Sequence, residues 1–94
     1  MIHIFEIVEK SGRKIRLTEE RWKHIANEHP SISHEEIKNV LIGPIVIKPS
    51  KYDPAHVRWY YSFNKVKKLY LMVAVKYLNG EGFVITAYYM RNIK

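Results

Sequence analysis

Cationic, aromatic and hydroxyl-bearing side chains recur at alternate positions in the second half of the chain. In the strand predicted over Lys68–Tyr77, the even positions include Tyr70 and Lys76, whereas the odd positions from 69 to 75 are apolar. Successive side chains of a strand point to opposite faces of the sheet, so one face is expected to form the core and the other to carry polar groups. Lysine and arginine bind phosphates and tyrosine rings stack on bases, so the pattern indicates a nucleic-acid-binding face.

The two strands that flank this one are expected to extend the same face. A tight turn before the last strand would place Thr86 opposite Ala74 and Tyr88 opposite Met72, and the preceding strand would bring Arg58 close to Met72. Arg58, Thr86 and Tyr88 are therefore predicted to cluster in the middle of the sheet. The predicted polar face comprises Arg58, Tyr60, Ser62, Lys68, Tyr70, Met72, Ala74, Lys76, Thr86, Tyr88 and Met90.

The same composition also fits a sheet face that a loop or a second subunit covers. Tyrosine and methionine are both common at protein interfaces. The sequence therefore leaves two interpretations open for this face, an RNA-binding surface and a contact with another protein, including a homodimer.

Proton transfer at neutral pH calls for a histidine, and three of the histidines are informative. His24 is the candidate general acid or base, although a solvent-exposed pair with Glu28 at i, i+4 explains it equally well. His29 lies on the apolar stripe of the same helix and is expected to cap its C-terminus beside the core. His56, close to Asp53 in a proline-bounded loop, is a second candidate. His24 and Glu28 alone provide too few metal ligands, so neither a metal nor a cofactor is expected.

Capping and turn residues predict the helices and strands that must position these side chains. Thr18 is a predicted helix N-cap and Pro30 ends that helix, while Ser33 with Glu36 forms a predicted capping box for a second helix that Gly43 ends. The predicted strands are Ile2–Val8, Lys14–Leu17, Ile45–Lys48, Val57–Phe63, Lys68–Tyr77 and Phe83–Arg91.

This order of elements predicts an α+β fold. Two helices in the N-terminal half should pack on one face of a four-stranded antiparallel sheet, preceded by a short β-hairpin, in a single domain over residues 1–94. The strand side chains expected to face the helices are Val57, Trp59, Tyr61, Phe63, Leu69, Leu71, Val73, Val75, Phe83, Ile85, Ala87 and Tyr89.

Charge and composition narrow the classes of partner. Sixteen Lys and Arg residues against nine Asp and Glu residues give a net charge of +7, which attracts polyanions such as RNA and would also suit an acidic protein. The chain has no cysteine, no apolar run long enough to span a membrane and no secretory signal at its N-terminus. These features favour a cytoplasmic protein with no membrane contact.

Several short motifs resemble one known family in their order along the chain. A W-x-H-I motif at Trp22–Ile25 is followed by His29-Pro30, and the ordered set resembles the phage barnase–EndoU–colicin–RelE-like (BECR-fold) nucleases. The resemblance extends from Leu17 to Arg91. Its remaining motifs are the L-x-x-P-x-x-I segment Leu41–Ile47, the aromatic triplet Trp59–Tyr61, the strand Leu71–Lys76 and the V-I-T-A-Y segment Val84–Tyr88.

The resemblance implies two helices followed by a four-stranded antiparallel sheet, and a small toxin-type ribonuclease that cleaves RNA without a metal. By this analogy His24, Lys76, Thr86 and Tyr88 would be the functional residues. If the family carries a basic residue between the two valines of its strand, this chain has Ala74 there. In that case Lys76 or Arg58 must supply the cation.

These observations lead to one functional hypothesis and one alternative. In the hypothesis the 2′-hydroxyl of RNA attacks the phosphate and leaves a 2′,3′-cyclic phosphate. His24 transfers protons, Lys76 and Arg58 neutralise charge, and Thr86 and Tyr88 position the phosphate. In the alternative the chain is a non-catalytic RNA-binding or partner-binding module. Expected partners are RNA, such as tRNA or mRNA, and an acidic antitoxin, and the further RNA contacts predicted are Tyr60, Lys68, Tyr70 and Arg91.

Overall fold

The computed structural model describes residues 3–93, and its elements follow the predicted order of two strands, two helices and four strands. The predicted start of the first strand at Ile2 lies outside the described residues. No helix in the described part of the chain is long and apolar enough to cross a membrane. The elements are β1 (His3–Val8), β2 (Lys14–Thr18), α1 (Glu19–Glu28), α2 (His34–Ile42), β3 (Val46–Pro49), β4 (Val57–Asn64), β5 (Leu69–Leu78) and β6 (Glu81–Met90).

Both helices begin at the predicted caps. The Thr18 hydroxyl accepts a hydrogen bond from the backbone N–H of Arg21 at 3.2 Å, which starts α1. The Ser33 hydroxyl accepts one from the backbone N–H of Glu36 at 3.1 Å, which starts α2. Each bond satisfies a backbone donor that has no partner within the helix. The backbone N–H of His29 donates a hydrogen bond to the Ile25 carbonyl at 2.8 Å, and α1 ends there. The prediction that His29 caps the C-terminus of this helix is therefore confirmed.

All six strands form one mixed sheet in the order β1-β2-β6-β5-β4-β3, in which β2 runs parallel to β6. The α+β prediction is confirmed, but the prediction of a four-stranded antiparallel sheet with a separate hairpin is wrong. The hairpin joins the sheet because Ile15 and Leu17 are fully buried in the main core. Gly82 permits the close pairing of β2 with β6, since a Cβ atom there would lie 2.9 Å from Val75 Cγ1.

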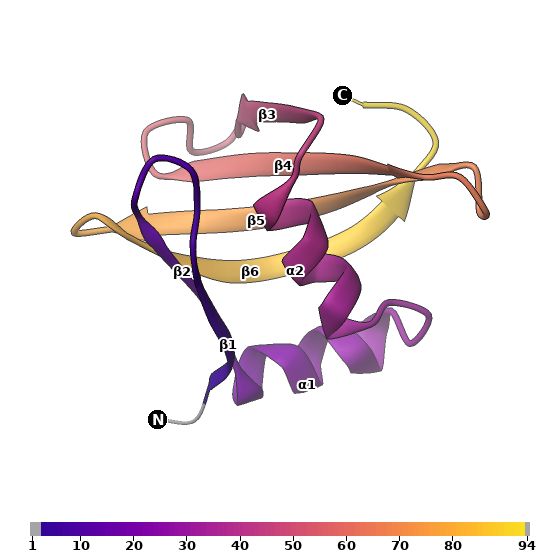
Figure 1. Ribbon diagram of the computed structural model, residues 1–94, viewed down its shortest axis with the longest axis horizontal. Helices are drawn as coiled ribbons and strands as arrows, with labels where there is room; N and C mark the ends of the chain where they lie inside the picture. The colour runs from indigo at the N-terminus through magenta and orange to yellow at the C-terminus, as the bar shows by residue number, and fades with distance from the viewer. Residues whose placement is uncertain (1–2, 94) are drawn as a thin grey trace.

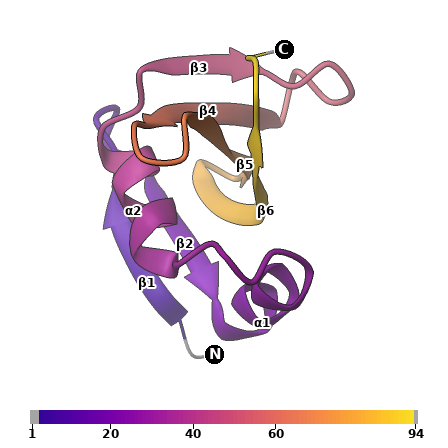
Figure 2. The same ribbon diagram turned by 90° about the vertical axis from the view of Figure 1, so that its right-hand side faces the viewer.

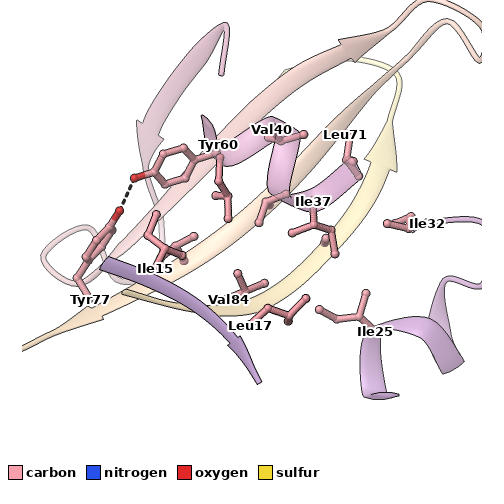
Figure 3. Close-up of a cluster of buried hydrophobic side chains, with 14 residues drawn as sticks. Ile15, Leu17, Ile25, Ile32, Ile37, Val40, Tyr60, Leu71, Tyr77 and Val84 are labelled. Atoms are coloured by element: carbon pink, nitrogen blue, oxygen red, sulfur yellow. Dashed lines mark hydrogen bonds between the residues drawn. The ribbon is translucent and has the colours of Figure 1, made fainter. Parts of the chain in front are cut away.

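The sheet curves strongly, and α2 lies in its concave side, where it packs against β1, β4 and β5 (Figures 1 and 2). Helix α1, at the bottom of the view in Figure 1, lies next to β2 and β6, where these two strands diverge. Figure 3 shows the core between the helices and the sheet, with apolar side chains from both helices and from β2, β4, β5 and β6 pointing inward.

The pairing of β4 with β5 reverses the predicted orientation of the β4 side chains. The turn between the two strands has four residues, 65–68, and pairs Asn64 with Leu69. Each odd residue of β4 therefore pairs with an even residue of β5. Tyr60 pairs with Val73 and faces the helices, whereas Trp59 and Tyr61 join a second cluster on the opposite face. The predicted core orientation of Val57, Trp59, Tyr61 and Phe63 is therefore wrong, and so is the predicted outward orientation of Arg58 and Tyr60.

A register shift in β6 changes which side chains of that strand face the helices. Val75 pairs with Val84 but Ala74 pairs with Thr86, so Ile85 is an extra residue. An inserted residue of this kind is a β-bulge, and it reverses the face of the residues that follow it. The predicted pairs Thr86–Ala74 and Tyr88–Met72 are confirmed, as are the inward positions of Ala87 and Tyr89. Phe83 and Ile85 lie on the other face, because Val84 occupies the core position instead.

One tyrosine links α2 to the far end of the sheet. The Tyr89 hydroxyl donates a hydrogen bond to Glu36 Oε2 and accepts one from the Asn64 amide at 3.1 Å. Burial, reinforced by the neighbouring Glu36 carboxylate, raises the pKa of Tyr89 from 10.0 to about 12. The neutral phenol is therefore the form that the fold stabilises.

Replacing Leu17 tests whether the hairpin is part of the core. We expect Leu17→Ala to lower the free energy of unfolding by about 2–5 kcal/mol, because it leaves a cavity in a fully buried site. Val8→Ala, at a position of the same hairpin whose side chain is 62% exposed, should change it by less than about 0.5 kcal/mol. Urea denaturation measures both values, and equal small effects would contradict the burial of the hairpin.

The pKa of Tyr89 predicts a loss of stability in alkaline solution. Because this pKa is raised in the folded state, the contribution of Tyr89 is complete below pH 10 and is lost as the pH rises from 10 towards 12. Tyr89→Phe has no such proton to lose, so its free energy of unfolding should fall less steeply over that interval than that of the wild type. Denaturation at several pH values measures the slopes. Tyr52→Phe, which removes an exposed hydroxyl, is the control and should keep the wild-type slope.

Candidate functional site

The face of β4, β5 and β6 turned away from α2, here called the outer face, gathers aromatic, methionine, threonine and lysine side chains. Its floor is nearly inaccessible to solvent, since Tyr61, Met72 and Ala74 are each at most 2% exposed. Partly buried side chains, among them Trp59, Ile85 and Tyr88, pack around that floor. The outer face comprises Val57, Trp59, Tyr61, Phe63, Tyr70, Met72, Ala74, Lys76, Phe83, Ile85, Thr86, Tyr88 and Met90.

Three of the four side chains predicted to be catalytic lie on this face. Thr86 pairs with Ala74 and Tyr88 with Met72, so these two side chains of β6 lie on the same side of the sheet. Lys76 also points outward, but along β5 it is roughly 7 Å from the level of Thr86 and about 13 Å from that of Tyr88. Thr86 and Tyr88 are therefore successive outward-facing residues of β6, and the lysine lies toward one end of the face.

A histidine reaches the outer face from the end of α1. The imidazole of His29 lies 5.9 Å from the Tyr88 ring, centroid to centroid, with 39° between the two planes. The loop that follows α1 allows this contact, because the helix ends next to β6 and Pro30 turns the chain away. His29 was expected only as a cap. The His-Pro pair at the helix end was its signal, but its contact with Tyr88 depends on how α1 packs on the sheet.

His24 lies elsewhere, on the solvent side of α1. Its side chain is 63% exposed, and its Nε2 atom is 2.6 Å from Glu28 Oε1. The structure thus forms the exposed His24–Glu28 pair that the sequence allowed, away from Thr86 and Tyr88. His56 pairs in a similar way with Asp53, at 3.0 Å, in the loop before β4.

Arg58 and Tyr60 face the helix side rather than the outer face. Tyr60 is 1% exposed, and its hydroxyl is hydrogen-bonded to that of Tyr77 (Figure 3). Burial raises the pKa of both phenols above the usual value. The Arg58 guanidinium lies 5.7 Å from the centre of the Tyr77 ring. The predicted cluster of Arg58 with Thr86 and Tyr88 is therefore wrong, because the β4–β5 turn sets the opposite register.

The other predicted RNA contacts lie around the far end of the outer face. Tyr70 points outward and its ring packs against Phe63 at 5.0 Å between centroids. Lys68 is exposed in the turn between β4 and β5, with a φ of 56°. Arg91 is exposed just beyond the end of β6. These three residues remain available to a ligand that crosses the sheet.

A compact loop flanks the outer face on the side opposite α1 (Figure 2). Ser50, only 4% exposed, accepts hydrogen bonds through Oγ from the backbone N–H groups of Tyr52 at 3.1 Å and Asp53 at 3.4 Å. The loop brings the Tyr52 ring to 6.3 Å from that of Trp59. A loop therefore borders part of the face, and the sequence had left open a sheet face covered by a loop or by a second subunit.

The electrostatic field over the outer face favours anions. No Asp or Glu occurs in β4, in β5 or in residues 82–90 of β6. Arg16, by contrast, is engaged by Glu6 at 2.7 Å and by Glu81 at 2.9 Å. Lys76 on the outer face and Lys51 beside it therefore have no carboxylate in the strands beneath them. In the described part of the chain, no group of three or more His, Asp or Glu side chains is arranged to hold a metal ion.

No family model, curated protein or solved structure matches this chain.

Removing the Tyr60 hydroxyl tests the assignment of this ring to the core. We expect Tyr60→Phe to lower the free energy of unfolding by about 1–3 kcal/mol, because the buried Tyr77 hydroxyl loses its partner. RNA affinity should stay unchanged, since the Tyr60 ring is 1% exposed. Urea denaturation and anisotropy of a labelled oligoribonucleotide measure the two quantities. Weaker RNA binding at unchanged stability would show instead that Tyr60 contacts the ligand.

Proposed function

We propose that this protein is a metal-independent endoribonuclease whose outer face binds single-stranded RNA. The observation that carries the proposal is the contact of His29 with Tyr88, two residues from Thr86, on a face whose strands carry no carboxylate. A proton-transfer group, two hydroxyls and a positive field are thus close together. These are the groups that cleavage by the 2′-hydroxyl requires.

The reaction needs only side chains of this kind. Neutral His29 takes the proton of the RNA 2′-hydroxyl, and the 2′-oxygen forms a bond to phosphorus. The bond from phosphorus to the 5′-oxygen breaks, and the 5′-oxygen leaves with a proton from water. Protonated His29 then gives its proton to the hydroxide that remains, which restores both the imidazole and the water. The products are a 2′,3′-cyclic phosphate and a 5′-hydroxyl, so the overall step transfers the phosphoryl group without net consumption of water.

The hydroxyls and the cation hold the phosphate during this step. Thr86 and Tyr88 donate hydrogen bonds to the non-bridging phosphate oxygens, on which negative charge increases in the transition state. Lys76 and Arg91 extend the positive field along the strand and neutralise neighbouring phosphates. His29 thus replaces His24 in the acid–base role, because His24 is engaged with Glu28 on the solvent side of α1.

The resemblance to BECR-fold nucleases supports this assignment as an analogy. Thr86 and Tyr88 belong to the T-A-Y part of the resemblance, and His29 to its His-Pro pair. The analogy also suggests a toxin with an acidic antitoxin as its partner. An acidic protein bound to the outer face would compete with RNA for the same positive field.

A second function, RNA binding without cleavage, is favoured by the distribution of cations. Lys76 lies about 13 Å along the strand from the level of Tyr88. Arg58, the other cation predicted for the site, faces the helix side. A binding module needs a positive, aromatic face but no cation at the scissile phosphate.

Replacing His29 distinguishes the two functions. His29→Gln keeps a polar side chain of similar size but cannot transfer a proton, so we expect RNA cleavage to slow by about 100- to 10,000-fold. His24→Gln, on the exposed face of the same helix, should cleave at the wild-type rate. Denaturing gels of total RNA, incubated with EDTA, measure the rates, and end-group analysis identifies the cyclic phosphate.

Some outcomes of this experiment would contradict the proposed role of His29 or the nuclease activity itself. Equal loss of activity in both histidine variants, or loss in His24→Gln alone, would contradict the role of His29. Salt-dependent RNA binding by the wild type without any cleaved product would establish the binding module in place of the nuclease.

A further inference from the structure

We propose that the hollow between the loop 50–56 and the outer face binds one unpaired nucleobase of RNA, with Lys51 contacting a neighbouring phosphate. The proposal rests on RNA as the ligand, as in the proposed function, but not on cleavage. It therefore identifies a base-binding subsite and the side chains that form it.

The hollow has a closed floor and aromatic walls. Tyr61 and Met72, both almost fully buried, lie at its base, and the rings of Tyr52, Trp59 and Tyr88 line it. Its volume is about 130 Å³. Drug-sized ligands occupy pockets of roughly 300–1,000 Å³, so this hollow suits a single flat ring system.

The lining is chemically matched to a base. Every nucleobase has a π-face, so aromatic side chains stack on it whatever its sequence. Tyr88 and Tyr52 add hydroxyl groups beside the ring system. Lys51 is an exposed cation that also lines the hollow, so it lies where the phosphate attached to a bound nucleotide would lie.

The loop holds its aromatic wall in place before any ligand binds. Tyr52 is 87% exposed, yet its backbone N–H is fixed by the buried Ser50 hydroxyl. The Asp53 carbonyl accepts hydrogen bonds from the N–H groups of His56 and Val57, at 3.2 and 2.9 Å, which closes the loop. Because the backbone is already ordered, binding a base costs little loop entropy. The Asp53 carboxylate, the one acidic group of the loop, pairs with His56.

Tyr88 connects the hollow to the catalytic groups. Its ring lines the hollow and also contacts His29. A base bound in the hollow would therefore belong to a nucleotide next to the phosphate held by Thr86 and Tyr88. This arrangement would give the cleavage reaction a preference for the base at one side of the broken bond.

Affinity for uncleavable oligonucleotides tests the hollow separately from catalysis. The probes are fluorescein-labelled pentanucleotides with 2′-O-methyl groups throughout, in matched versions that carry bases or abasic sites, measured by anisotropy. The wild type should bind the base-bearing probes more tightly, and Tyr52→Ala should lose roughly 5- to 150-fold of that preference, the range for one stacked base. Lys51→Ala should weaken both probes alike and reduce the salt slope by about one.

Matched controls lie outside the outer face. Val66→Ala, at a side chain that is 92% exposed, and Lys10→Ala, in the exposed turn between β1 and β2, should leave both affinities unchanged. All variants alter exposed positions, so each should unfold at the wild-type urea midpoint.

The outcomes of these binding measurements test the hollow independently of the nuclease proposal. Loss of base preference in Tyr52→Ala supports the hollow even if the wild type cleaves no RNA, in which case only the nuclease proposal fails. Equal wild-type affinity for base-bearing and abasic probes would overturn the hollow even if RNA is cleaved. A wild-type dimer that dissociates on Tyr52→Ala, as measured by light scattering, with unchanged RNA affinity would assign the hollow to a protein interface instead.

Discussion

The extra residue at Ile85 lets β6 fill both faces of a curved sheet. Before this bulge Val84 points to the helices, and after it Ala87 and Tyr89 do so, while Thr86 and Tyr88 point outward. Without the inserted residue, a strand with Val84 in the core would turn Thr86 and Tyr88 toward the helices. The positions of the two candidate phosphate-binding hydroxyls therefore depend on this local irregularity.

The tyrosines divide into two groups with different physical roles. On the helix side, the hydroxyls of Tyr60 and Tyr77 bond to each other and that of Tyr89 bonds to Glu36, so these rings combine apolar burial with satisfied polar ends. On the outer side, Tyr52 and Tyr88 line a hollow at the surface. The first group belongs to the core between the helices and the sheet, and the second group provides the surface that we assign to RNA.

The function that we propose depends on side chains from three elements that border one face. The sheet supplies Thr86, Tyr88 and Lys76, the end of α1 supplies His29, and the Ser50-organised loop supplies Tyr52. Side chains on a rigid sheet and on a loop held by buried hydrogen bonds keep their geometry without a ligand. A small domain can thus form a binding site at its surface without a deep cavity in its core.

The sequence by itself determined the class and order of the elements and both helix caps, because these features depend on residues close together in the chain. The predicted pairing of Thr86 with Ala74 also requires the bulge at Ile85, which the alternation of the strand did not indicate. Tertiary structure decided the rest. The join of β2 to β6, the inward orientation of Tyr60 and the contact of His29 with Tyr88 depend on register and packing between distant segments. Adding or removing one residue in a turn moves every side chain of the next strand to the opposite face of the sheet. The alternation of residue types along a single strand does not reveal the length of the turn in the folded protein.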